Sequence, residues 1–140
     1  RQAMAQATAG TGVVVTRTAD NQLKLEIPSD ISFDSGKAAI KPQMRPILDR
    51  FAQTLKDNPA TNVRIIGHTD SKGSDAINNP LSLERAASAR DYLTDRGVAQ
   101  GRIEIAGRGS REPVADNGSE AGRARNRRIE VFVAEAAAAR

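Results

Sequence analysis

The sequence contains no cysteine and no tryptophan, and it has only three phenylalanines and one tyrosine among 140 residues. Without cysteine the chain has no disulfide framework, no thiolate zinc site and no cysteine nucleophile. Because aromatic side chains are scarce, we expect a core built mostly from Val, Ile, Leu and Ala. Fractions of 39% apolar and 27% charged residues are typical of one globular domain and exclude a disordered chain.

Long apolar runs and a strong excess of one charge are also missing. No stretch approaches the roughly 18 apolar residues that a membrane-spanning helix requires. The net charge is only +4, and positive charge is concentrated near the C-terminus, in Arg123, Arg125, Arg127 and Arg128. This cluster makes a polyanion-binding module an alternative function, although Glu130 follows it and no aromatic residues alternate with the arginines to stack on bases.

The pattern of apolar residues predicts an α/β fold. A hairpin of residues 13–16 and 23–27 is followed by alternating apolar residues and a turn within 29–39, a helix over 42–57 and a strand over 62–68. A helix from Ser82 to Arg96 and strands at 103–105 and 127–133 complete the order, with loops at 70–80 and 107–122. We therefore expect a two-layer sandwich with the helices packed on one face of a mixed β-sheet. The domain spans residues 12–133, between a linker at 1–11 and a disordered tail at 134–140.

Arg85 breaks a local rule of helix chemistry. We expect Ser82 to cap the N-terminus of the second helix, so Arg85 occupies the position where a capping box places Glu or Gln. A cation there opposes the helix dipole, at a cost of a few tenths of a kcal/mol. Its partner is expected to be a protein carboxylate or an anionic ligand drawn to the helix start; the alternative is an ordinary solvated arginine.

Asp70 follows the carboxyl end of a predicted central strand, where open α/β sheets collect ligands. An aspartate here also favours a turn by bonding its own backbone, which is the simpler interpretation. Asp70 and Arg85 together can face each other across a cleft and match an ammonium and a carboxylate on one ligand carbon. A direct salt bridge between the two residues is the alternative.

Catalytic and metal sites are poorly supported. His68 is the only histidine, and a Ser-His-Asp site with Asp70 and either Ser71 or Ser82 lacks a nucleophile elbow and an oxyanion-hole pattern. The segment after Asp70 lacks the alternating carboxylates of a calcium loop. We therefore expect no enzyme activity, no metal and no cofactor, with wall hydrolysis by His68 and Asp70 as the third hypothesis.

The last strand assigns different roles to the neighbouring arginines. If Ile129 and Val131 face the helices, alternation places Arg127 on the same side, toward the cleft. Arg128 then lies on the open face, where it can pair with Glu130. Arg123 and Arg125 are expected on a solvated strand edge that charge protects from aggregation.

Taken in order, three motifs resemble the OmpA-like C-terminal domain, the family of peptidoglycan-associated lipoproteins and the stator protein MotB. The motifs are Gly67-His68-Thr69-Asp70-Ser71, Asn78-x-x-Leu81-Ser82-x-x-Arg85-Ala86 and Gly122-Arg123-x-x-Asn126-Arg127-Arg128. The resemblance covers roughly residues 30–133. Two departures, Ile77 at a position that is often aromatic and Pro80 before Leu81, affect only the local loop.

This resemblance implies a non-catalytic module that binds peptidoglycan non-covalently through the meso-diaminopimelate of the stem peptide. In the family the aspartate equivalent to Asp70 holds the ligand ammonium and the arginine equivalent to Arg85 holds its carboxylate. The other family positions that match are Asn78, Leu81, Arg127, Asp34 and Ser35. The implied location is the periplasm, where the module would anchor an outer-membrane or envelope protein of a Gram-negative cell to the wall.

Overall fold

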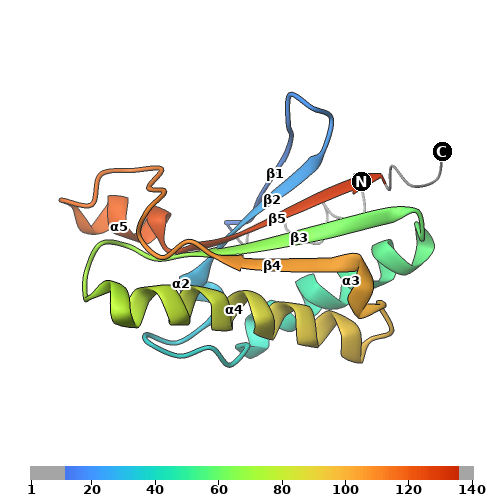
Figure 1. Ribbon diagram of the computed structural model, residues 1–140, viewed down its shortest axis with the longest axis horizontal. Coiled ribbons are helices and arrows are strands. Elements are labelled where there is room, and N and C mark those ends of the chain that lie inside the picture. The colour runs from blue at the N-terminus through green and yellow to red at the C-terminus, as the bar shows by residue number, and fades with distance from the viewer. Residues whose placement is uncertain (1–11, 136–140) are drawn as a thin grey trace.

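A five-stranded sheet carries two main helices on one face in the computed structural model, which describes residues 12–135 (Figure 1). The elements in chain order are β1 Val14–Arg17, β2 Leu23–Pro28, α2 Ser29–Ser32, η1 Pro42–Met44, α3 Arg45–Asp57, β3 Thr61–His68, α4 Asp75–Asp95, η2 Gln100–Arg102, β4 Ile103–Gly107, α5 Glu120–Asn126 and β5 Arg128–Glu135. The strand order is β1-β2-β5-β3-β4, with β3 and β4 parallel and the other pairs antiparallel. The predicted two-layer sandwich and N-terminal hairpin are confirmed.

The core lies between the sheet and helices α3 and α4, and it is almost entirely aliphatic. Leu25, Ile65 and Val131 point inward from β2, β3 and β5 and meet Phe51 and Leu55 of α3, all at 3% exposure or less. Burying this apolar surface is the main stabilising contribution to the fold. None of the helices in residues 12–135 is long and apolar enough to cross a membrane.

Helix α4 begins at Asp75, and its predicted start at Ser82 is wrong. Backbone N–H groups of Ile77 and Asn78 already donate to the Ser74 carbonyl, at 3.1 and 2.9 Å. The helix continues through Pro80, which removes only the donor to the carbonyl of exposed residue 76, where water can replace it. Arg85 therefore lies more than two turns into the helix, and the predicted conflict with the helix dipole does not arise.

Three other boundaries differ from the prediction. Residues 29–32 form one helical turn, α2, in place of a purely alternating segment. The short helix α5 interrupts the predicted loop and carries Arg123 and Arg125, which are therefore not on a strand edge. Strand β5 begins at Arg128 and continues to Glu135, so any tail starts at least two residues later than expected. The predicted linker at 1–11 and residues 136–140 lie outside the described residues.

Two glycines let α4 lie directly on the sheet. A Cβ on Gly67 would collide with the Ser82 carbonyl oxygen and lie 2.8 Å from its carbonyl carbon. A Cβ on Gly107 would lie 2.5 Å from the backbone nitrogen of Leu83. The expectation that Gly67 permits a close backbone approach is confirmed. This contact sets the height of α4 above the ends of β3 and β4, and Arg85 lies one turn further along the helix.

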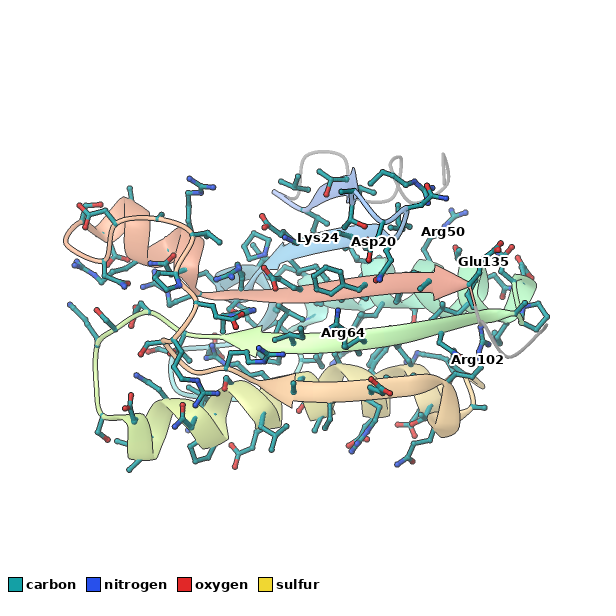
Figure 2. The ribbon with its side chains drawn as sticks, turned by 45° about the horizontal axis from the view of Figure 1, so that its top comes forward. Asp20, Lys24, Arg50, Arg64, Arg102 and Glu135 are labelled. Atoms are coloured by element: carbon teal, nitrogen blue, oxygen red, sulfur yellow. The ribbon has the colours of Figure 1, made fainter. Side chains whose placement is uncertain are left out.

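The outer face of the sheet is covered at one end and open at the other. At the covered end Arg128 pairs with Glu130 at 3.0 Å, as predicted, but both are buried, because Arg128 also donates to the Glu112 carbonyl of the overlying loop. At the open end Phe132 lies between Lys24 and Arg64 on the two neighbouring strands, with the charged groups 5.6 and 4.9 Å from its ring centre (Figure 2). These cations help to cover the half-buried ring.

Candidate functional site

A pocket opens beside the carboxyl end of β3, between α2, the loop that follows it, α4 and α5. Its lining includes all seven residues that the sequence predicts for the site: Asp34, Ser35, Asp70, Asn78, Leu81, Arg85 and Arg127. The topology explains this convergence, since β3 and β5 run antiparallel and the end of β3 meets the start of β5 at His68 and Arg128.

Arg85 is the buried cation of the pocket, with 5% of the residue exposed. Its Nε donates to the Lys37 carbonyl at 2.8 Å and its Nη2 to the Asp34 carbonyl at 3.1 Å, while the guanidinium lies 4.9 Å from the Phe33 ring centre. Nη1 donates to no residue within 12–135, and no carboxylate in that range forms an ion pair with Arg85. Burial lowers the pKa of Arg85, with nearby Asp30 opposing this effect.

Asp70 has two partners, and neither is Arg85. Its Oδ1 accepts the backbone N–H of Lys72 at 2.9 Å, and its Oδ2 accepts Arg127 Nη1 at 2.7 Å. The turn role considered for Asp70 is therefore confirmed, whereas a direct Asp70–Arg85 salt bridge does not form. The residue is 8% exposed and lines the same pocket as Arg85. The two opposite charges thus lie in one pocket without neutralising each other.

Arg127 is held by three carboxylates from three different elements. It donates to both oxygens of Asp30 at 3.0 Å, to Asp70 at 2.7 Å and to Glu120 at 2.8 Å. The hydrogen bonds to Asp30 above all, followed by those to Glu120 and Asp70, outweigh burial and raise the pKa of Arg127 above its ordinary value. The prediction that Arg127 reaches the cleft is confirmed, although it does so from the residue before β5.

Sequence reasoning missed Asp30 and Glu120. Asp30 lies 97 residues before Arg127, so no local pattern connects them. Glu120 carries a weak local indication: it opens α5 directly after Ser119, whose hydroxyl accepts the Gly122 N–H as an N-cap. An acidic residue in a first helical turn is usually explained by the helix dipole alone.

The remaining predicted residues shape the pocket in different ways. Asn78 is buried and donates to the Lys72 carbonyl at 2.9 Å, so it fixes the loop that carries Asp70. Asp34 contributes its carbonyl to Arg85 and its exposed carboxylate to an ion pair with Lys41 at 3.6 Å. Ser35 is exposed and Leu81 half-buried in the lining.

His68 does not take part in this pocket. It is 1% exposed, and its Nε2 lies 2.9 Å from Glu130 Oε1. Because Glu130 is ionised and accepts only, the proton of that bond belongs to Nε2. The catalytic arrangement with Asp70 and a serine is therefore not assembled. Within residues 12–135 no group of three His, Asp or Glu side chains is placed to hold a metal ion.

The C-terminal arginine cluster is largely neutralised by its own domain. Arg123 pairs with Glu120 at 3.2 Å, Arg128 pairs with Glu130, and Arg127 pairs with three carboxylates. In the described part of the chain, Arg125 is the one member of the cluster without an ion pair. This pairing disfavours the polyanion-binding alternative, which needs several free cations.

Comparison with known proteins identifies a family and relatives of the chain. The sequence model of the OmpA family matches residues 32–127. The chain is 43% identical over 122 residues to the probable lipoprotein YiaD of Escherichia coli K12, covering 87% of this chain and 55% of YiaD. It is 46% identical over 103 residues to the peptidoglycan-binding protein ArfA of Mycobacterium tuberculosis H37Rv, covering 74% of this chain and 32% of ArfA. The chain thus spans about half or less of the length of these relatives.

A solved structure extends the similarity to the whole fold. The cell wall anchor of the T6SS from Pseudomonas aeruginosa aligns with a TM-score of 0.84 and 32% identity, covering 96% of this chain and 95% of the anchor. Both its sequence and its fold place the protein in the OmpA family.

Proposed function

We propose that the domain binds peptidoglycan non-covalently by holding the free end of meso-diaminopimelate in the stem peptide. It thereby anchors an outer-membrane or envelope protein to the wall, in the periplasm of a Gram-negative cell. Support comes from membership of the OmpA family and from relatives named as a peptidoglycan-binding protein and as a cell wall anchor. The domain acts as a binding module and not as an enzyme.

The main support for this proposal is that the Arg85 guanidinium is buried without a carboxylate partner among residues 12–135. A buried guanidinium with no carboxylate partner among residues 12–135 is costly, because backbone carbonyls compensate only part of the lost hydration. A ligand carboxylate in the pocket supplies the missing charge and accepts from the free Nη1. Such charge-assisted bonds are about twice as strong as neutral hydrogen bonds.

Asp70 provides the opposite end of the clamp. A carboxylate offers about four lone-pair positions, and Asp70 uses two of them, for Lys72 and Arg127. The remaining positions can accept an ammonium on the same ligand carbon as the carboxylate. The lining supports such a ligand, since it carries both signs equally, with carboxylates at Asp30, Asp34, Asp70 and Glu120 and cations at Lys41, Lys72, Arg85 and Arg127.

Binding to purified sacculi tests the proposal. We expect Asp70→Ala and Arg85→Ala each to weaken binding by on the order of 2–5 kcal/mol, because the opposite ligand charge is left unpaired. Matched controls are Arg90→Ala and Asp91→Ala, which remove an exposed ion pair at 3.1 Å on the same helix and should bind as wild type. Circular dichroism establishes that each variant is folded. Binding of both clamp variants at the wild-type level would overturn the proposal.

A further inference from the structure

We infer that Glu120 and Asp30 are positioning residues for the ammonium end of the pocket. They hold Arg127 away from full pairing with Asp70, and in this way they keep Asp70 available to the ligand. This inference rests on the proposed function and deepens it, because it names two residues that set the preference of the pocket for an ammonium-bearing ligand.

The hydrogen bonds of Arg127 are divided unequally among its three partners. Asp30 receives two parallel bonds, from Nε and Nη2, both at 3.0 Å. Glu120 accepts from Nη2 at 2.8 Å, and only Nη1 reaches Asp70, at 2.7 Å. A guanidinium prefers to bind a carboxylate through two parallel bonds. Asp30 takes that two-bond arrangement, so Arg127 engages only one oxygen of Asp70, Oδ2.

The charges around Arg127 leave one carboxylate in excess. The cluster holds Asp30, Asp70 and Glu120 against Arg127 and Arg123, which bonds Glu120 at 3.2 Å. Arg85, in the same lining, is a cation without a carboxylate partner among the described residues. The pocket therefore places this excess carboxylate charge near Arg85, and Lys72 is a further lining cation without an ion pair among residues 12–135. An incoming centre with one ammonium and one carboxylate can neutralise the excess carboxylate and Arg85 together.

Removing either positioning residue changes the hydrogen bonds that Arg127 can form with Asp70. Without Glu120 or Asp30, a donor of Arg127 is released, and the guanidinium can turn to pair with Asp70 through two bonds. That pairing neutralises Asp70 and competes directly with the ligand ammonium. Arg85 lies on α4 and keeps its bonds to the carbonyls of residues 34 and 37, so recognition of the carboxylate is retained.

The test compares two stem tripeptides. In both, the same end of the third residue forms the peptide bond, and the other end is free. One carries meso-diaminopimelate, and the other carries 2-aminopimelate, whose free end keeps the carboxylate and lacks the ammonium. Calorimetric titration of Glu120→Gln and Asp30→Asn should show roughly fivefold weaker binding of the first peptide, as for loss of an exposed charge interaction. Binding of the second peptide should not weaken.

Glu112→Gln is the matched control, since it removes an exposed carboxylate that pairs with Arg108 at 2.8 Å outside the pocket lining. It should leave both affinities unchanged. If a variant loses the same affinity for both peptides, or if the ratio of the two affinities stays as in the wild type, the positioning role is overturned. This holds even where the wild type binds the meso-diaminopimelate peptide. Failure of the wild type to bind the meso-diaminopimelate peptide overturns the proposed function itself, and with it this inference.

Discussion

Replacing Gly67 with alanine should destabilise the domain and weaken ligand binding together. The new Cβ would collide with the Ser82 carbonyl oxygen and lie 2.8 Å from the carbonyl carbon, where ordinary contact begins at 3.4 Å. To restore ordinary contact with that carbon alone, helix α4 must retreat by 0.6 Å. The obstructing atoms are backbone of a fully buried residue, and no side-chain rotation can relieve them.

The expected loss of stability is about 3 kcal/mol, the upper part of the range for overpacked cores, because a whole helix must move. Urea denaturation followed by circular dichroism measures this loss, and binding to sacculi is measured on the same preparation. Binding should fall as well, since Arg85 lies one turn beyond Ser82 on the displaced helix.

Gly101→Ala is the control for this substitution, because a Cβ at Gly101 meets no atom within 4 Å. It should change the free energy of unfolding by less than about 1 kcal/mol. A Gly67→Ala protein as stable as the Gly101→Ala protein, with unaltered binding, would refute the idea that the glycine contact sets the position of α4.

Two further predictions concern buried polar groups behind the pocket. Burial raises the pKa of Glu130, but the His68 hydrogen bond and the Arg128 charge outweigh it and leave the value at about 2, against 4.5 for an unperturbed glutamate. The depressed pKa stabilises the fold above pH 4.5, and this contribution, on the order of 3 kcal/mol, is lost as the pH falls toward 2. Acid titration of stability should therefore be flatter in Glu130→Gln, whereas exposed Glu104→Gln should keep the wild-type profile. Asn126→Ala should cost about 2 kcal/mol, because the buried amide oxygen accepts two backbone N–H groups of the loop, at 2.7 and 2.9 Å. Amide hydrogen exchange of residues 114–117 should accelerate in that variant and stay unchanged in Asn62→Ala, which lies on the exposed sheet surface.

The sequence predicted the sheet well because alternation reports directly on burial. Ile65 and Val131 point into the core, and the hairpin and the parallel pair form where apolar alternation and turn residues indicate them. Alternation cannot show what lies above a strand, however. Arg128 and Glu130 were assigned correctly to the outer face, but only the fold reveals that a loop buries them there.

The helices were less predictable, for identifiable reasons. Pro80 suggests a helix boundary, yet α4 runs through it, because the carbonyl of residue 76 that loses its donor is exposed and can bond water. Helix α5 has only seven residues and follows a segment rich in Gly and Ser, so its periodicity is too short to detect. Arg85 therefore lies in the pocket as predicted, but it does so from the interior of α4 and not from the N-terminus of a helix.

Local sequence patterns indicate some residues of the site, whereas others are brought there only by the tertiary fold. A strand end and a motif mark Asp70 and Arg85 in the sequence, and the fold brings both into the lining of one pocket. Two partners of Arg127, Asp30 and Glu120, could not be predicted, because they come from opposite ends of the domain and meet only when β2 pairs with β5. Charge balance in the pocket is thus a property of the fold and not of any segment.

The most direct test of the central claim is a calorimetric and NMR titration of the wild type with two stem tripeptides that differ in the free end of the third residue. Meso-diaminopimelate offers an ammonium and a carboxylate there, whereas lysine offers the ammonium alone. The clamp of Asp70 and Arg85 predicts at least tenfold tighter binding of the meso-diaminopimelate peptide, about 1.4 kcal/mol or more, with chemical-shift changes centred on both residues. Equal affinity for the two peptides, or shifts confined to residues outside the pocket, would contradict it.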